Sequence, residues 1–220
     1  MKKIMFPVLA LLMGGIILFS ANTAHAQVSY GVKLGPDFSS LAYKIDNSKT
    51  TSKMLVGVAG GVYANLPIAP QFYVQPSLMY EGKGGKDKST DIKTRLNYLT
   101  LPIDLLFKPE MPNGSGAWIV GIGPYFGYGL SGKTSGTAGN TTFSGDPFKD
   151  NGSGASLKRF DAGANVQLGY EMSNGFNIGL NAEWGLVNIL NNAGSSGSGS
   201  SNSARNTSFA VMVGYTLGKR

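Results

Sequence analysis

Cysteine is absent from the 220 residues, so the chain has no disulfide framework and no cysteine that could carry a lipid anchor. Its one histidine, His25, lies in an N-terminal stretch that we expect to be removed. The mature chain would then contain neither a thiol nor an imidazole. Triads of the Ser-His-Asp and Cys-His types need one of these groups, as do the common zinc sites. The sequence therefore predicts a protein that is not an enzyme and holds no metal or cofactor.

Long apolar runs are also scarce, because the sequence has only one, over residues 4–19. Two lysines precede this run, and the small-residue triplet Ala24, His25 and Ala26 follows it, as in a secretory signal peptide with its cleavage site. We expect a signal peptide over residues 1–26, cleaved after Ala26, and a single domain over residues 27–220. A retained membrane helix is the alternative.

The segment 96–108, LNYLTLPIDLLFK, alternates between two faces with a period of two residues, which predicts a β-strand. Tyr98, Thr100 and Asp104 lie on its smaller, mostly polar face. An aspartate in the middle of a strand fits a soluble core poorly, but it fits a membrane barrel with a lipid-facing exterior and a polar interior. The apolar face consists of Leu99, Leu101, Ile103, Leu105 and Phe107.

Seven further segments repeat this alternation. Their polar faces are rich in glycine and amides, which suit the narrow interior of an eight-stranded barrel, and their apolar faces carry almost no charge. The predicted fold is an all-β, eight-stranded antiparallel up-and-down transmembrane β-barrel. A soluble barrel or sandwich, which would bury the apolar face, is the alternative. The predicted strands cover residues 28–37, 54–66, 72–81, 96–108, 117–130, 159–171, 176–188 and 208–217.

Connections between the predicted strands alternate between long and short. Short turns of bacterial outer-membrane barrels face the periplasm and long loops face outward. We therefore expect a monomer in the Gram-negative outer membrane with both termini in the periplasm. The last long connection contains the Gly- and Ser-rich segment 194–203, which we expect to be disordered. Aromatic residues near the strand ends, such as Phe72 with Tyr80 and Trp118 with Tyr128, predict two interfacial girdles.

Several segments together resemble the PorT-like outer-membrane barrel family of Bacteroidetes. The most specific are YLTLPIDL around Pro102 and GPYFGY around Pro124, and the resemblance covers essentially the whole mature chain. It implies an eight-stranded outer-membrane barrel in a family with many members of unknown function, one of them linked to assembly of the type IX secretion machinery. It implies no catalytic motif. The C-terminus departs from the family pattern, because Leu217 stands where an aromatic residue is common.

Charged residues on the predicted interior faces point to a plug. Lys33 lies at mid-depth on the first strand, and we expect it to form a hydrogen-bonded charge cluster with Asp104 and Glu183 that leaves no continuous water path. Two further carboxylates on interior faces, Glu81 and Asp161, fit structural charges better than a glycosidase pair, since such an interior leaves little room for a sugar.

A basic run lies in the predicted loop after the third strand. We expect this patch to be solvated at the outer surface, with lipopolysaccharide as a second reading and no nucleic-acid partner. Asp87 and Asp91 dilute its charge. The basic residues are Lys83, Lys86, Lys88, Lys93 and Arg95.

Three functions remain open at this point. The first is a structural or binding barrel that presents its long loops at the cell surface to lipid, lipopolysaccharide or an envelope protein partner. The second is an accessory role in protein secretion, which rests on the family resemblance. The third is a channel for small solutes, which a side-chain-filled interior argues against.

Overall fold

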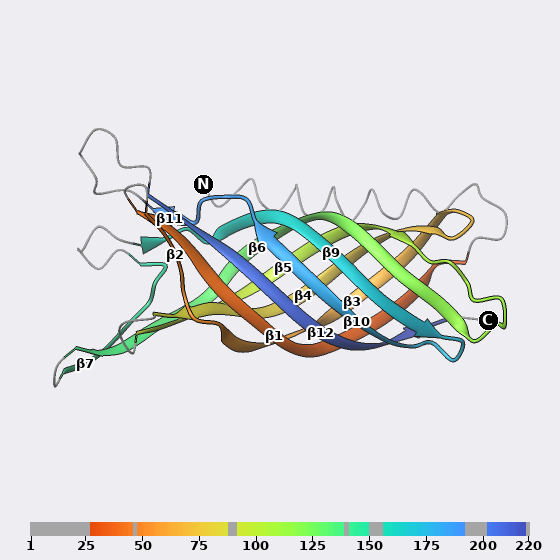
Figure 1. The fold of residues 1–220 in the computed structure, drawn as a ribbon, viewed down its shortest axis with the longest axis horizontal. Coiled ribbons are helices and arrows are strands. Elements are labelled where there is room, and N and C mark those ends of the chain that lie inside the picture. Colours follow the sequence, from red (N-terminus) through yellow and green to blue (C-terminus); the bar gives the residue numbers. More distant parts are fainter. Residues whose placement is uncertain are drawn as a thin grey trace, which may run out of the picture.

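The computed structural model describes residues 27–45, 48–87, 92–138, 141–149, 156–191 and 202–218. Eight long antiparallel strands within these ranges form a closed barrel (Figure 1). Each strand pairs with the next one along the chain, and the last pairs with the first, so the predicted up-and-down barrel is confirmed. The strands are β1 (Ser29–Ile45), β3 (Leu55–Ala69), β4 (Phe72–Lys86), β5 (Lys93–Phe107), β6 (Gly116–Ala138), β9 (Phe160–Met172), β10 (Phe176–Gly185) and β12 (Ser203–Leu217).

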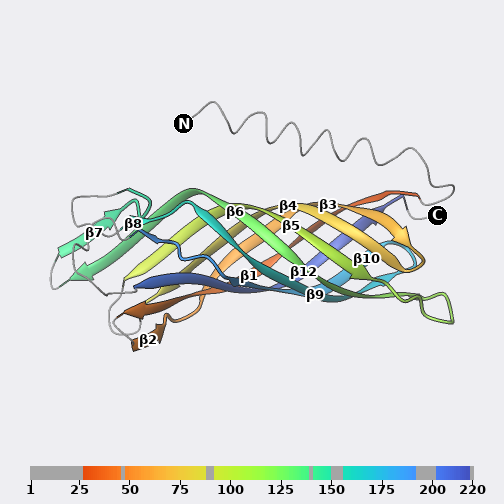
Figure 2. The same ribbon diagram turned by 90° about the horizontal axis from the view of Figure 1, so that it is seen from above.

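Short connections gather at one end of the barrel and long connections at the other, as Figures 1 and 2 show. We call these the short-turn end and the long-loop end. Tyr30 near the start of β1 pairs with Leu217 at the end of β12, so both ends of the barrel sheet lie at the short-turn end. Four small elements decorate the long-loop end: β2 (Ser48–Thr51), β7 (Thr141–Gly145), β8 (Ser156–Leu157) and β11 (Leu190–Asn191).

Several strands continue beyond their predicted ends toward the long-loop end. β1 reaches Ile45, β4 reaches Lys86 and β6 reaches Ala138, so much of what the sequence predicts as long loops is paired sheet. The two-residue period fades there because glycine, serine and threonine replace the apolar residues. The pairing itself continues, since it depends on backbone groups and not on side-chain polarity.

The predicted inward and outward faces are confirmed along the barrel. Asp104 is fully buried in the interior, whereas the neighbouring Leu105 keeps 47% of its surface exposed on the outside. Large apolar side chains stay exposed on the outward faces of all eight strands, which is the surface that lipid requires. Thr100, Asn165 and Gln167 are buried on the inside.

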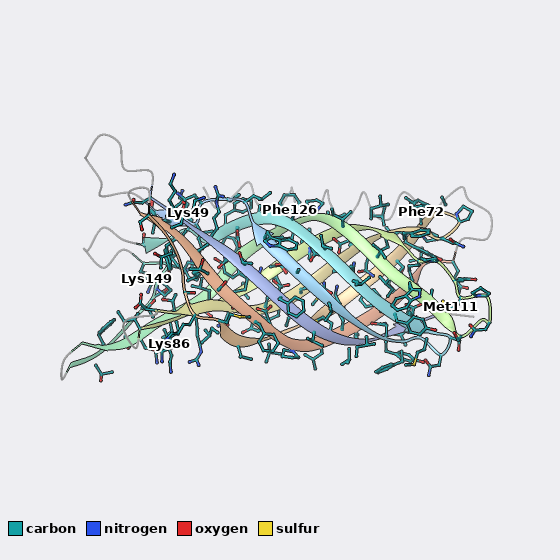
Figure 3. The ribbon with its side chains drawn as sticks, in the orientation of Figure 1. Lys49, Phe72, Lys86, Met111, Phe126 and Lys149 are labelled. Atoms are coloured by element: carbon teal, nitrogen blue, oxygen red, sulfur yellow. The ribbon has the colours of Figure 1, made fainter. Side chains whose placement is uncertain are left out.

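Aromatic side chains mark both ends of this apolar belt. Toward the short-turn end the Phe72 and Phe107 rings lie 5.0 Å apart, and the Trp118 and Tyr170 rings lie 5.4 Å apart. Toward the long-loop end Tyr80 and Tyr128 flank Leu99 in the sheet. Figure 3 shows Phe72 and Met111 at the short-turn end, with Lys49, Lys86 and Lys149 at the other end. The arrangement matches interfacial girdles.

Close strand packing requires glycine at particular interior positions. A Cβ atom on Gly123 would lie 2.0 Å from the Ile103 carbonyl oxygen, which is backbone and cannot move aside. One on Gly31 would lie 2.2 Å from the Tyr63 ring. The glycine-rich polar faces noted in the sequence therefore serve to let backbone and large interior side chains approach closely.

The predicted signal peptide, the segment 194–201 and Lys88 lie outside the described residues. Within the described part of the chain, no helix is long and apolar enough to cross a membrane.

Candidate functional site

Polar and charged side chains fill the barrel interior in three layers. The layer nearest the short-turn end centres on Glu171 of β9. Lys108 Nζ donates to Glu171 Oε2 at 2.9 Å, and the Thr216 hydroxyl donates to the same oxygen at 2.7 Å. The Tyr63 phenol lies 2.8 Å from the Thr216 hydroxyl and accepts a hydrogen bond from Asn177 Nδ2 at 2.9 Å. These hydrogen bonds connect side chains of β3, β9, β10 and β12 across the barrel interior.

The middle layer is an amide network around Asp104. Asn165 and Gln167 donate from Nδ2 and Nε2 to Asp104 Oδ2 at 2.8 and 2.9 Å. Gln167 Nε2 also donates to Gln75 Oε1, and Gln75 Nε2 donates to Asn65 Oδ1. A carboxylate in a narrow interior is costly unless hydrogen-bonded, and these amides supply that stabilisation.

The third layer, toward the long-loop end, is a buried ionic cluster around Lys83 of β4. Lys83 Nζ donates to Glu183 Oε2 at 2.5 Å and lies 2.9 Å from Glu81 Oε2. It also lies 4.6 Å from the centre of the Tyr125 ring, a cation–π contact. Tyr125 OH donates to Asp161 at 3.2 Å. One lysine therefore holds two carboxylates and an aromatic ring in place.

The prediction that Lys83 belongs to a basic surface loop is wrong. The two-residue period predicts a third strand that ends at Glu81, with Lys83 in the exposed basic patch beyond it. In the structure β4 continues to Lys86, and its alternation puts Glu81 and Lys83 on the same inward face. Only 1% of the Lys83 surface is exposed. The Gly-Lys-Gly-Gly segment predicts a loop because it lacks the apolar residues that mark a strand.

The predicted partners of Lys33 are arranged differently from the expectation. Lys33, Asp104 and Glu183 are all buried in the interior, and the charges of Asp104, Glu81 and Glu183 all act on Lys33. Lys33 Nζ has no hydrogen-bond partner among the described residues, whereas Glu183 bonds to Lys83.

Strand register explains the difference. Glu183 faces Ser208 on β12, and Ser208 faces Ser39 on β1, six residues beyond Lys33. Six residues of extended chain span about 20 Å. Neighbouring strands of a closed barrel are staggered, and this stagger, which the two-residue period does not encode, separates Lys33 from Glu183 along the barrel.

An apolar cluster, which we call the cap, adjoins the ionic cluster, since Lys83 Nζ lies 5.7 Å from the centre of the Tyr98 ring. Buried Leu41, Leu96, Tyr98, Ile189 and Ala204 form its core. Phe148 reaches in from the segment after β7 and packs edge-on against the Tyr98 ring, with ring centres 6.2 Å apart. Periodicity does not predict this cap, because Phe148 lies in a Gly-, Thr- and Asn-rich stretch without alternation.

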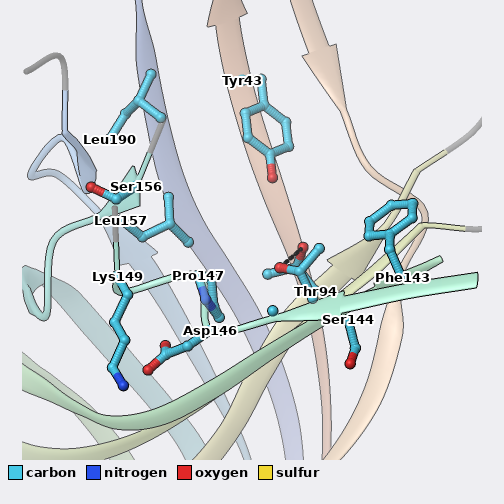
Figure 4. Close-up of a pocket in the computed structure, with 12 residues that line it drawn as sticks. Tyr43, Thr94, Phe143, Ser144, Asp146, Pro147, Lys149, Ser156, Leu157 and Leu190 are labelled. Carbon is cyan, nitrogen blue, oxygen red and sulfur yellow. Dashed lines mark hydrogen bonds between the residues drawn. The ribbon is translucent and has the colours of Figure 1, made fainter. Parts of the chain in front are cut away.

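A pocket of about 470 Å³ lies at the long-loop end, where Leu157, Leu190 and Tyr43 also pack against the cap. Figure 4 shows Asp146 and Lys149 on one side of this pocket and Phe143 on the other. We call it the long-loop pocket. The Thr94 and Thr134 hydroxyls at its wall lie 3.1 Å apart (Figure 4). The pocket therefore combines aromatic, hydroxyl and charged groups.

Tyr43 contributes a neutral phenol to the pocket wall. Burial raises the pKa of the Tyr43 phenol above its usual value, and the charge of Asp87 raises this pKa further. The phenol therefore stays protonated and can donate a hydrogen bond to a ligand.

The described remaining members of the predicted basic patch lie on the outward faces of their strands. Lys86, Lys93 and Arg95 belong to paired strands, and Arg95 is exposed. Within the described ranges, no group of three or more His, Cys, Asp or Glu side chains could hold a metal ion.

A closed eight-stranded barrel with an apolar exterior, two aromatic girdles and a polar interior is the architecture of a transmembrane β-barrel. The family model of the outer membrane protein beta-barrel domain matches residues 20–191. The chain belongs to this family and is an outer-membrane β-barrel protein.

Solved structures with a similar fold include three outer-membrane proteins. Ail, the attachment invasion locus protein of Yersinia pestis, is 13% identical, with a TM-score of 0.45 over 87% of this chain and 100% of that chain. OprG of Pseudomonas aeruginosa is 14% identical, with a TM-score of 0.47 over 88% and 98%. Neisserial surface protein A is 10% identical, with a TM-score of 0.43 over 86% and 99%. No curated protein matches the chain.

Proposed function

We propose that this protein is a non-conducting outer-membrane barrel that binds a ligand at the cell surface through its long-loop end, and that it is not an enzyme. The observation that carries the proposal is the filled interior. The ionic cluster contacts the cap through Lys83 and the Tyr98 ring, and the long-loop pocket shares Tyr43, Leu157 and Leu190 with the periphery of the cap. A ligand could enter the pocket without a path through the barrel.

The chemistry of the pocket favours a small polar ligand with an apolar face, such as a saccharide. Tyr43 and Phe143 offer aromatic surface, and the hydroxyls of Thr94 and Thr134 offer hydrogen bonds. Asp146 can accept hydrogen bonds from ligand hydroxyls. A binding screen on immobilised saccharides, with the Phe143→Ala variant as the matched negative, tests this reading.

Conductance in planar bilayers tests the closed interior. We expect no ohmic steps from the wild-type barrel, because buried side chains of the three layers occupy its narrow interior. A variant that removes Lys83, Glu183 and Phe148 together supplies the positive control for an opened interior. Steady wild-type conductance would favour the channel alternative and overturn the proposal.

Orientation can be tested with single cysteines, because the native chain has none. Thr50→Cys in β2 lies at the long-loop end, and Asn113→Cys lies in a short turn. A membrane-impermeant maleimide should label Thr50→Cys in intact cells and Asn113→Cys only after lysis. The reverse pattern would place the long-loop pocket in the periplasm. An accessory role in secretion, by contrast, rests on the PorT-like resemblance alone.

A further inference from the structure

The strand β7 forms an edge of the barrel sheet at the long-loop end. Among the described residues it pairs only with β6, from Gly145 opposite Thr134 to Thr141 opposite Ala138. Figures 1 and 2 place it at the tip of the long-loop end. Because the backbone groups of an antiparallel strand point alternately to its two sides, half of those of β7 point away from β6. These groups are available to a further strand.

The long-loop pocket lies against this edge. Successive side chains of a strand point to opposite faces of the sheet. The pocket nevertheless contacts Phe143, Ser144 and Gly145 in succession, which indicates that it meets the backbone edge of β7 and not one of its faces. Its opposite wall includes Ser156 and Leu157 of β8, which pairs only with β11 within the described ranges (Figure 4). The pocket therefore lies between two strands that each have an unpaired edge.

One backbone hydrogen bond joins the two walls of the pocket. The Leu157 N–H donates to the Pro147 carbonyl oxygen at 2.7 Å, and both residues line the pocket. The chain that follows β7 therefore reaches β8 at Pro147, whereas β7 itself and β8 do not pair. The space between them, about 470 Å³, has strand backbone on two sides. An extended chain in this space would find backbone partners that a compact ligand does not use.

The β7 edge lacks the features that protect strand edges from pairing. Protected edges carry lysine, proline or a bulge. The sequence of β7, Thr-Thr-Phe-Ser-Gly, has neither a charge nor a proline, and Phe143 keeps 39% of its surface exposed. The other edge strand at this end, β2, has the exposed Lys49 within its four residues. An uncharged edge with an exposed aromatic side chain suits the addition of a strand from another chain.

We propose that the long-loop pocket binds an extended, uncharged peptide segment of another protein, which adds a strand to the β7 edge. Backbone hydrogen bonds would supply affinity, and alternate side chains would supply specificity. The five residues of β7 offer about 17 Å of edge. β-Branched or aromatic residues of the peptide suit the Phe143, Leu157 and Leu190 side chains of the pocket. This inference rests on the proposed surface-binding function and names the class of its ligand, since such a peptide also combines polar groups with an apolar face.

Selection from a displayed library of random seven-residue peptides, with the folded barrel in detergent as the target, tests the proposal. We expect the enriched peptides to be uncharged and to carry β-branched or aromatic residues at alternate positions. The strongest binder is then synthesised, together with two copies that are N-methylated at its odd or its even residues. N-methylation removes backbone donors and keeps every side chain. The copy that loses its donors toward β7 should bind at least about tenfold more weakly.

Two variants and hydrogen exchange locate the peptide. Ser144→Lys gives β7 a charge like that of Lys49 in β2, and it should weaken binding by about tenfold or more. Lys49→Ser, the matched change in the other edge strand, should bind as the wild type does. Alternate backbone amides of β7 should exchange rapidly in the free barrel and slowly with the peptide bound. Heat-dependent gel mobility verifies that each variant is folded.

Three outcomes would overturn the proposal. One is a library that yields no enriched peptide. Another is equal binding of the parent peptide and both N-methylated copies, which would show that backbone pairing is not involved. The third is protection of all β7 amides in the free barrel, which would show that the edge is already covered. Saccharide binding without peptide binding would contradict this inference and leave the surface-binding function intact, whereas steady conductance would overturn that function and leave the peptide result unaffected.

Discussion

Replacing Lys83 with methionine removes the base that neutralises Glu183 and Glu81 inside the barrel. Lys83 Nζ lies 2.5 Å from Glu183 and 2.9 Å from Glu81, and all three side chains are at most 9% exposed. Removing one partner of a buried pair costs about 3 to 5 kcal/mol, because the remaining charge is left without compensation. We expect Lys83→Met to lower the free energy of unfolding by this amount. Lys158→Met, at an exposed lysine, should change it by less than about 0.5 kcal/mol.

Replacing the carboxylates that contact Lys83 should partly reverse the destabilisation caused by Lys83→Met. Adding Glu183→Met to Lys83→Met removes one of the two carboxylates that have lost their counter-charge. The double variant should therefore recover part of the lost free energy of unfolding. Adding Glu81→Gln as well should recover most of it, because apolar or neutral replacement of a whole buried ionic group is often nearly neutral. Lys33→Met should cost less than about 2 kcal/mol, since Lys33 Nζ makes no hydrogen bond to the described residues.

Urea unfolding in phospholipid vesicles measures these changes. The chain has two tryptophans, Trp118 and Trp184, and both are exposed on the outward face, so their fluorescence reports on contact with lipid. The coupling between Lys83→Met and Glu183→Met should exceed about 1 kcal/mol. Strictly additive losses in this double-mutant cycle would refute the ion pair. A loss in Lys83→Met no larger than that in Lys158→Met would refute its burial.

Three other changes test the barrel. Val120→Arg places a charge on the lipid-facing surface and should cost about 2 to 4 kcal/mol of unfolding free energy in vesicles, whereas Lys49→Glu should leave folding unchanged. Gly123→Ala sets a Cβ atom 2.0 Å from the Ile103 carbonyl oxygen and should abolish the folded band on unheated gels, unlike Gly82→Ala, whose nearest contact is 3.4 Å. Phe148→Ala removes an aromatic ring that packs against the cap and should lower the free energy of unfolding by about 2 kcal/mol. The backbone amides of Leu96 and Tyr98 should then exchange hydrogen faster. Unchanged exchange at these amides would show that Phe148 does not stabilise the cap.

The barrel could be predicted from sequence because its rule is local. Each residue of a strand faces the side opposite to its neighbour, so the pair Asp104 and Leu105 already reveals which side is polar. Strand count and connection lengths follow from the same alternation. Alternation no longer predicts a strand where its outward residues are not apolar, as around Lys83. The backbone pairing nevertheless continues there.

Contacts between distant strands could not be predicted in the same way. The Lys83 bond to Glu183 joins residues 100 positions apart, and it depends on the stagger between strands, which no single strand encodes. Phe148 meets Tyr98 only because the segment after β7 folds over the barrel mouth. Arg95 and Lys133 illustrate the same limit, since they become neighbours through a register that shifts between Asn97 and Tyr98.

The charges of the barrel are divided between its two surfaces. Among the described residues, three buried lysines, Lys33, Lys83 and Lys108, lie with the buried carboxylates Asp37, Glu81, Asp104, Asp161, Glu171 and Glu183. The interior therefore contains more acidic than basic side chains, while Lys53, Arg95 and Lys133 are exposed on the outside of the barrel. Because burial disfavours a charged carboxyl, the interior acids need the hydrogen bonds and lysines that surround them, whereas the outer bases are solvated.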